Sequence, residues 1–232
     1  MEPELGFAGG AYELIGSLVG DMEGKEVCVI GSGDNYAAFA LAGMEASVTS
    51  VDISDRQLDT ASGRAEQLGL SIAFVRADAA DLKPLADRTY DLVCSTNGFF
   101  VWVADLRTVY GEIFRILKPG GHYVFYDVHP FQRLWKSGNR SIEVEKTYWQ
   151  TGPYRDEKDE TFEYNWTLGE ILNPLTDTGF VLRRVLERPA GDENYWEGSS
   201  FLPCSDRRLL DWKENPLAAL PVWLSSALQK PV

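Results

Sequence analysis

The stretch from residue 26 to 52, EVCVIGSGDNYAAFALAGMEASVTSVD, decides the fold of this chain. An apolar run over residues 27–30 ends in the glycine turn Gly31-Ser32-Gly33-Asp34-Asn35. A helix of small apolar residues and a second apolar run, residues 48–53, come next. Strand, glycine turn, helix and strand in this order predict a βαβ unit at the start of a parallel sheet.

The glycine turn has the features of a ligand site. Gly31 and Gly33 lack a Cβ and let the backbone approach a bound molecule closely. The helix that follows offers unpaired N–H groups to a negatively charged group. Asp52 lies 21 residues after Gly31, at the tip of the second strand, where an acid can accept hydrogen bonds from both ribose hydroxyls. The pattern predicts an adenosine-containing cofactor, and the alternative is a βαβ unit that binds no nucleotide.

The third glycine position helps to separate the candidate cofactors. A dinucleotide-binding turn has a third glycine where this chain has Tyr36. The turn instead resembles motif I of the class I S-adenosylmethionine-dependent methyltransferases, which is usually an acid, one residue, and then Gly-x-Gly-x-Gly. Val29 stands where the family's acid is often found, and Asn35 stands at its third glycine. Asparagine tolerates left-handed backbone, so we expect Asn35 to hold the turn.

Four further segments resemble motifs of the same family, in the family's order. They are residues 51–54 at the end of the second strand, 74–79 at the end of the third, 90–97 in and after the fourth, and 115–128, a helix end, turn and fifth strand. The chain is therefore identified as a member of the small-molecule, methyltransferase-domain 11/25-like branch. The resemblance implies a Rossmann-like, doubly wound α/β fold with seven strands in the order 3-2-1-4-5-7-6 and the last strand antiparallel. The closing strands are expected at 180–188 and 221–230.

The resemblance also implies a set of cofactor contacts. S-adenosylmethionine, or its product S-adenosylhomocysteine, would meet Asp52 at the ribose, Asp78 and the Ala79 N–H at the adenine, and the glycine turn at its methionine portion. The complete set of expected cofactor residues is Gly31, Ser32, Gly33, Asn35, Asp52, Ile53, Gln57, Asp78, Ala79, Asn97 and Gly98.

Composition limits the partners. The formal net charge is −13 and the sequence pI is about 4.6, so nucleic acids and anionic membranes are poor partners. Cys28, Cys94 and Cys204 show neither a disulfide framework nor metal-ligand spacing. No signal peptide or membrane-spanning run is evident, and we expect a cytoplasmic monomer or homodimer without a metal.

We expect a single domain with three parts. The cofactor-binding half covers about residues 20–130, an inserted lid about 130–166, and a closing helix with two strands about 167–232. All seven tryptophans come after residue 100, outside the cofactor motifs. Alternating runs at 142–148 and 162–166 predict an inserted hairpin that forms an aromatic lid over the acceptor. Alternatively, these aromatic side chains pack the insertion against the sheet, or they form a surface for docking a protein.

His129 is the candidate general base, because it follows the fifth strand at its carboxyl end and a neutral imidazole is available near pH 7. Its alternative roles are to orient the substrate or to hydrogen-bond a loop. Tyr148, Tyr154 and Tyr164 are weaker candidates. The function that fits best is methyl transfer to a small, partly apolar acceptor. A catalytically silent, cofactor-binding regulator and an NAD-dependent oxidoreductase remain alternatives.

Overall fold

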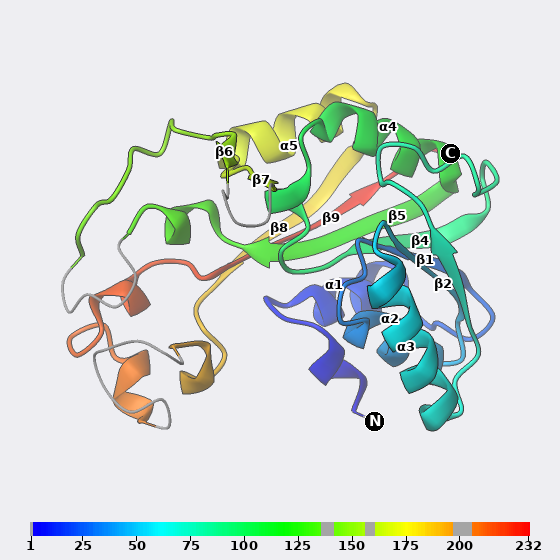
Figure 1. Ribbon diagram of the computed structural model, residues 1–232, viewed down its shortest axis with the longest axis horizontal. Helices are drawn as coiled ribbons and strands as arrows, with labels where there is room; N and C mark the ends of the chain where they lie inside the picture. The colour runs from blue at the N-terminus through cyan, green and yellow to red at the C-terminus, as the bar shows by residue number, and fades with distance from the viewer. Residues whose placement is uncertain (1, 136–141, 156–160, 197–205) are drawn as a thin grey trace.

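The computed structural model describes residues 2–135, 142–155, 161–196 and 206–232 (Figure 1). The α-helices are α1 Ala11–Leu18, α2 Tyr36–Gly43, α3 Asp55–Leu68, α4 Leu106–Ile116 and α5 Leu168–Asp177. The main strands are β1 Glu26–Ile30, β2 Ser47–Asp52, β3 Ile72–Arg76, β4 Tyr90–Ser95, β5 Leu117–Val128, β8 Val181–Arg188 and β9 Trp223–Gln229. The short strands β6 Tyr154–Arg155 and β7 Phe162–Glu163 form a separate pair. The 3₁₀ turns are η1 Pro3–Gly6, η2 Phe100–Trp102, η3 Pro130–Arg133, η4 Glu193–Trp196, η5 Arg207–Leu210 and η6 Pro216–Ala219.

The seven main strands form one sheet in the order β3-β2-β1-β4-β5-β9-β8. The pairs among β1 to β5 are parallel, and β9 runs antiparallel to both of its neighbours. Numbered without the short hairpin, this order is 3-2-1-4-5-7-6 with the last strand antiparallel. The predicted fold class is confirmed.

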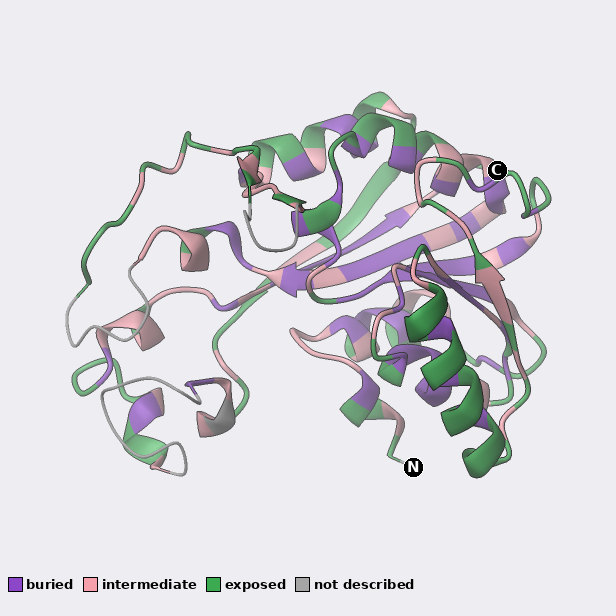
Figure 2. Ribbon diagram, in the orientation of Figure 1, coloured by how far each residue is buried: buried purple, intermediate pink, exposed green. Residues whose placement is uncertain are grey.

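Helices cover both faces of the sheet (Figure 1). On one face α1 and α2 pack against Val27 and Val29 of β1, and Phe39 of α2 joins α2 to α3. On the other face α4 and α5 pack against the opposite side of the same strands, with Tyr123 and Phe125 at the centre. The strands at the centre of the sheet are largely buried, whereas the outer face of α3 is exposed (Figure 2). This alternation places the carboxyl ends of β1 to β5 together at one edge, where ligands bind in such sheets.

Local capping residues define the ends of the helices. Ser54 caps α3 by accepting a hydrogen bond from the Gln57 N–H, and Gly69 ends that helix in a left-handed conformation. Thr167 and Glu170 form a reciprocal capping box at the start of α5.

The start of the fifth strand differs from the prediction. The sequence predicts a turn over residues 118–121 before a strand at 122–128, but β5 begins at Leu117. Leu117 pairs with Tyr90 and His122 pairs with Leu92, so the intervening residues bulge out of the register without leaving the sheet. The Gly120 N–H donates to the carbonyl of Lys230 over 2.9 Å, which keeps this bulged segment beside the end of the chain although Gly120 itself has a φ of 81°.

A hairpin is present in the insertion, but the prediction of which residues form its strands is wrong. Residues 142–148 do not pair with 162–166; they contain only an isolated bridge between Trp135 and Val144. The segment 162–163 pairs instead with Tyr154–Arg155, which directly follows the Gly152-Pro153 turn. The tip at 156–160 lies outside the described residues, as does Cys204. None of the described helices is long and apolar enough to cross a membrane.

Candidate functional site

The glycine turn between β1 and α2 adopts a backbone that its sequence favours. Gly31, Gly33 and Asn35 have φ of 54°, 50° and 65°. A Cβ on Gly31 would collide with the ring of Phe99, whereas the space beside Gly33 is open. Gly31 is therefore needed for close packing against the loop after β4, and Gly33 for access to a ligand.

The side chains of Asn35 and Ser32 stabilise this turn through hydrogen bonds. Both side chains are buried, and Asn35 Nδ2 donates to the Gly33 carbonyl over 2.8 Å. Ser50 Oγ donates to Asn35 Oδ1 over 2.5 Å and lies 2.8 Å from Ser32 Oγ. Asn35 thus holds the left-handed position as expected, but its side chain and that of Ser32 do not face the cavity described next.

A cavity of about 500 Å³ opens at the carboxyl ends of β1 to β4. Nine of the eleven expected cofactor residues line it: Gly31, Gly33, Asp52, Ile53, Gln57, Asp78, Ala79, Asn97 and Gly98. Its volume lies within the usual range for ligand sites. We call it the cofactor cavity.

The two acids in the cofactor cavity are fixed by backbone donors. Asp52 accepts from the N–H groups of Gly33 and Ser54, over 3.0 and 2.9 Å. Asp78 accepts from the Ala80 N–H over 2.9 Å. Each carboxylate oxygen can accept more than one hydrogen bond, so both acids keep capacity for ligand hydroxyl or amino groups.

This cavity has an apolar wall that the sequence motifs did not predict. Phe99, Trp102 and Val103 line it, and 57% of Trp102 remains exposed. Trp102 lies outside the cofactor motifs in the sequence, but in the structure it lines the cofactor cavity. The signal was the aromatic run Phe99-Phe100-Val101-Trp102 immediately after the Asn97-Gly98 loop.

Asp127 holds that loop in place and was also missed. Its buried carboxylate, near the end of β5, accepts from the N–H groups of Gly98, Phe100 and Val128 over 3.0, 3.1 and 2.7 Å. Burial raises the pKa of Asp127, while Arg133, 3.9 Å away, and the three N–H donors oppose that rise. An acid inside an otherwise apolar strand was the signal. Asp127 joins β5 to the loop that closes the cofactor cavity.

His129 does not line the cofactor cavity. It is fully buried, and its Nδ1 accepts from the Phe131 N–H over 3.2 Å. Its Nε2 lies 2.9 Å from Glu187 Oε1, but in poor geometry for a hydrogen bond. Burial lowers the pKa of His129, although the Glu187 carboxylate opposes that shift. This geometry fits the loop hydrogen bond that was considered as its alternative role, and it disfavours a general base.

The insertion between β5 and α5 packs on the same loop. The Tyr164 N–H donates to the Val101 carbonyl over 2.8 Å, and Trp166 Nε1 donates to the Val103 carbonyl over 3.1 Å. Tyr164 and Trp166 stack at 5.3 Å between ring centroids. The Tyr148 hydroxyl accepts from the Leu168 N–H over 2.7 Å. The tyrosines that were weaker candidates for the base do not line the cofactor cavity. Among the described residues, no group of three or more His, Cys, Asp or Glu side chains could hold a metal ion.

Comparison with known proteins gives consistent matches. A family model described as "Methyltransferase domain" matches residues 28–125. An uncharacterized methyltransferase, YbaJ, of Bacillus subtilis is 26% identical over 183 residues, which are 73% of this chain and 71% of that protein. The sterol 24-C-methyltransferase erg6 of Aspergillus fumigatus is 35% identical over 112 residues, which are 47% of this chain but only 29% of that enzyme.

The fold is shared with solved structures over nearly the whole chain. An S-adenosylmethionine-dependent methyltransferase from Mesorhizobium loti superimposes with a TM-score of 0.69 at 21% identity, covering 96% of this chain and 98% of that one.

Proposed function

Because this chain belongs to the class I S-adenosylmethionine-dependent methyltransferases, we propose that it transfers a methyl group from S-adenosylmethionine to a small, partly apolar acceptor. Its cofactor is S-adenosylmethionine. The observation that carries the proposal is the cofactor cavity, where a glycine turn and acids from two successive strand ends, Asp52 and Asp78, face one space.

Each polar group in the cavity has a partner on the cofactor. Asp52 would accept from the ribose hydroxyls, as its position at the tip of β2 suggests. Asp78 would accept from the adenine amino group, with the Ala79 N–H at a ring nitrogen. The open side of Gly33 would take the methionine portion, next to Asn97 and Gly98.

Methyl transfer asks the protein mainly to position the reactants and to exclude water. When bound, the cofactor supplies a methyl group on positively charged sulfur, which departs as a neutral thioether. Phe99, Trp102 and Val103 would cover the bound cofactor, and Asp127 would fix the loop that carries them. Because the leaving group is a neutral thioether, no general acid is required, and a general base is required only when the acceptor must lose a proton before or during attack. The buried His129 is not part of this proposal.

Calorimetry with S-adenosylhomocysteine tests the proposal. Wild-type protein should bind it, and NAD should bind much more weakly because Tyr36 occupies the third glycine position of a dinucleotide turn. In Asp52→Ala the ribose hydroxyls lose their acceptor, which should cost about 1–3 kcal/mol, or roughly 5- to 150-fold in affinity. Asp59→Ala removes the same charge from an exposed position on α3 and should bind like wild type.

Three results would count against the proposal. Undiminished binding by Asp52→Ala would remove Asp52 from the site. NAD binding as strong as that of S-adenosylhomocysteine would favour the oxidoreductase alternative. Binding without turnover on any of a broad set of acceptors would favour the silent regulator.

A further inference from the structure

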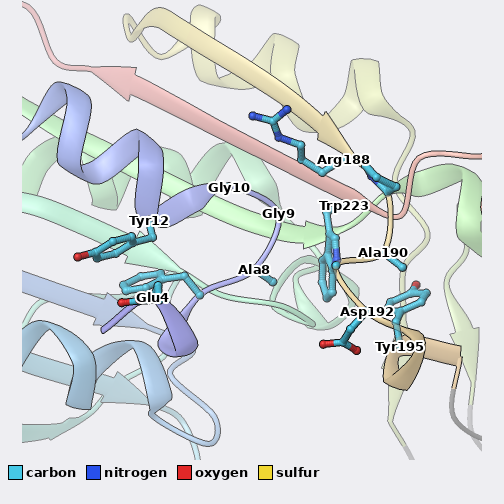
Figure 3. A pocket seen from close by; sticks show the side chains of 13 residues that line it. Glu4, Ala8, Gly9, Gly10, Tyr12, Arg188, Ala190, Asp192, Tyr195 and Trp223 are labelled. Atoms are coloured by element: carbon cyan, nitrogen blue, oxygen red, sulfur yellow. The ribbon is translucent and has the colours of Figure 1, made fainter. Parts of the chain in front are cut away.

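A second and larger cavity, of about 630 Å³, lies beside the carboxyl end of β5 (Figure 3). Three segments far apart in the sequence build it: the N-terminal turn before α1, the residues after β8, and Trp223 at the start of β9. Trp223 pairs with Val128 in β5 and with Arg188 in β8, so the cavity lies at the same edge of the sheet as the cofactor cavity. We call it the aromatic cavity.

One side chain links the aromatic cavity to the glycine turn. The ring of Tyr126, on β5, meets the rings of Phe7 and Trp223 edge-on, at 6.3 and 6.2 Å between centroids. Burial, and next the carboxylate of Asp34 in the glycine turn, raise the pKa of Tyr126. Phe7 and Trp223 line the aromatic cavity, while Gly33, next to Asp34, lines the cofactor cavity. The Tyr126 hydroxyl also donates to the Gly6 carbonyl over 3.3 Å, and a Cβ on Gly6 would lie 2.8 Å from the Tyr36 carbonyl oxygen at the start of α2. The N-terminal wall of the aromatic cavity therefore lies beside the end of the glycine turn that leads into α2.

Two pairs of aromatic rings line the aromatic cavity, one with steeply inclined planes and one with its planes only 32° apart. Tyr195 and Trp223 lie 5.4 Å apart between centroids, with their planes at 69°. Phe7 and Tyr12 form a second pair at 6.0 Å. Ring faces carry negative partial charge, and two rings at a steep angle can both face one cation. Burial raises the pKa of Tyr195 to about 12, so at neutral pH it is an uncharged phenol.

The charged groups around the aromatic cavity favour a positive ligand. Two acidic residues, Glu4 and Asp192, are among the residues that line it. Among the described residues that line it, the one cationic side chain is that of Arg188, which forms an ion pair with Glu13 of α1 at 3.1 Å. The Arg188 guanidinium points away from Asp192 and Tyr195 (Figure 3). The whole chain carries a formal charge of −13, which also attracts cations.

We propose that the aromatic cavity is the acceptor site and that the acceptor is an amine. This inference rests on the proposed methyltransferase function. The acceptor reacts as the free amine, so an ammonium form first releases its proton to solvent. The nitrogen lone pair forms the new N–C bond as the C–S bond breaks, and the C–S electron pair stays on sulfur. Positive charge passes from sulfur to nitrogen, where the faces of Trp223 and Tyr195 stabilise it during transfer and in the product.

A pair of probes with the same shape and different charge tests this assignment. Choline and the neutral 3,3-dimethyl-1-butanol would each be titrated by calorimetry into protein saturated with S-adenosylhomocysteine. Choline should bind about 3- to 30-fold more tightly, the range expected for a cation held by aromatic faces. Trp223→Ala should remove most of that preference, and Trp223→Phe should keep part of it because a ring remains.

Controls separate the possible failures. Trp149→Ala changes a tryptophan that is 79% exposed and outside the cavity, and it should leave choline binding unchanged. Binding of S-adenosylhomocysteine by each variant shows that the variant is folded. If Trp223→Ala does not bind S-adenosylhomocysteine, Tyr195→Leu is used instead, because it removes the other ring. Equal affinity for choline and its neutral counterpart, or full choline affinity in a folded ring-deletion variant, would overturn the amine assignment while leaving the methyltransferase proposal intact. Failure of wild-type protein to bind S-adenosylhomocysteine would instead overturn both.

Discussion

The cofactor cavity and the aromatic cavity lie at one edge of the same sheet, but they are built in different ways. Each strand end between Gly31 and Val103 contributes a short, contiguous piece of the cofactor cavity. The aromatic cavity joins Phe7 to Tyr195 and Trp223, which lie more than 180 residues away along the chain. The first cavity depends on strand-end motifs, whereas the second depends on the docking of the N-terminal segment against the closing strands. Substitutions that affect one cavity and spare the other would test this difference.

The largest effect is expected at Asp127, which holds the loop at the cofactor cavity and does not line the aromatic cavity. Asp127→Ala leaves the N–H groups of Gly98, Phe100 and Val128 without their acceptor, at a cost of about 1–3 kcal/mol for each group that stays buried. The loop after β4 should shift, and the affinity for S-adenosylhomocysteine should fall by about 10- to 100-fold in calorimetry. Affinity for choline should change by less than about threefold.

Asp127→Asn offers a graded comparison. Its one remaining oxygen can still accept from Gly98 and Val128, but its amide nitrogen would face the Phe100 N–H, so an intermediate loss is expected. A folded Asp127→Ala variant that binds S-adenosylhomocysteine like wild type would show that the loop does not need this carboxylate.

A smaller effect, confined to the aromatic cavity, is expected at Gly9. A Cβ on this residue would lie 2.6 Å from Ser225 Oγ and 2.8 Å from the Cβ of Trp223, and its φ of 61° disfavours any other residue. Gly9→Ala should loosen the N-terminal segment by about 1–2 kcal/mol, weaken choline binding about tenfold, and leave S-adenosylhomocysteine binding within about twofold.

Gly16→Ala is the matched control for Gly9→Ala. Gly16 lies within α1, where a Cβ meets open space, so the substitution should not weaken either ligand. Limited proteolysis gives an independent measurement, because a loosened segment should be cut before Ala11 faster than in wild type. Equal loss of both ligands in Gly9→Ala would mean that the two cavities are not independent.

The smallest effect is expected at His129 and should concern stability alone. Burial lowers the pKa of His129 in the folded protein, so the unfolded chain, with a pKa near 6.5, binds the proton more readily. Above pH 6.5, the neutral ring contributes its full stabilisation to the folded protein. This stabilisation is lost as the pH falls from 6.5 toward the lower pKa of the folded state. It amounts to about 1.4 kcal/mol for each unit by which the folded pKa lies below the unfolded one. Urea unfolding of wild type and His129→Asn between pH 7.5 and 5 should show a steeper pH dependence in wild type.

His122→Asn provides the comparison for that measurement, since burial also lowers the pKa of the half-buried His122. Neither variant should change ligand binding at pH 7.5. A large loss of turnover in His129→Asn, with cofactor affinity and stability retained, would restore His129 as a catalytic candidate.

The sequence alone was sufficient for the parts of the fold whose signals are local. The sequence specifies the glycine turn, the caps at Ser54 and Thr167, and the acids at the ends of β2 and β3 within a few residues. This is possible because positive φ, unpaired N–H groups and strand ends are short-range properties. The order of the strands also followed from the sequence, because motifs of one family occur in one arrangement.

The structure differs from the prediction where contacts between residues far apart in the chain determine the local arrangement. The hairpin was assigned the wrong strands because alternation predicts an extended segment without naming its partner, and Tyr154 rather than residues 142–148 lies beside Glu163. His129 looked available because it follows a strand, but Glu187 of β8 and the turn at Phe131 bury it.

The sequence by itself therefore determined the sheet, the glycine turn and the strand-end acids of the cofactor cavity. Only the tertiary structure decided that Asp127 braces the loop after β4 and that Phe7, Tyr195 and Trp223 enclose one cavity. The physical reason is that a hydrogen-bonded turn or cap lies within a few residues of one segment. A cavity lined by aromatic rings from distant segments depends on which segments pack together. That packing is determined by the burial of apolar side chains over the whole chain.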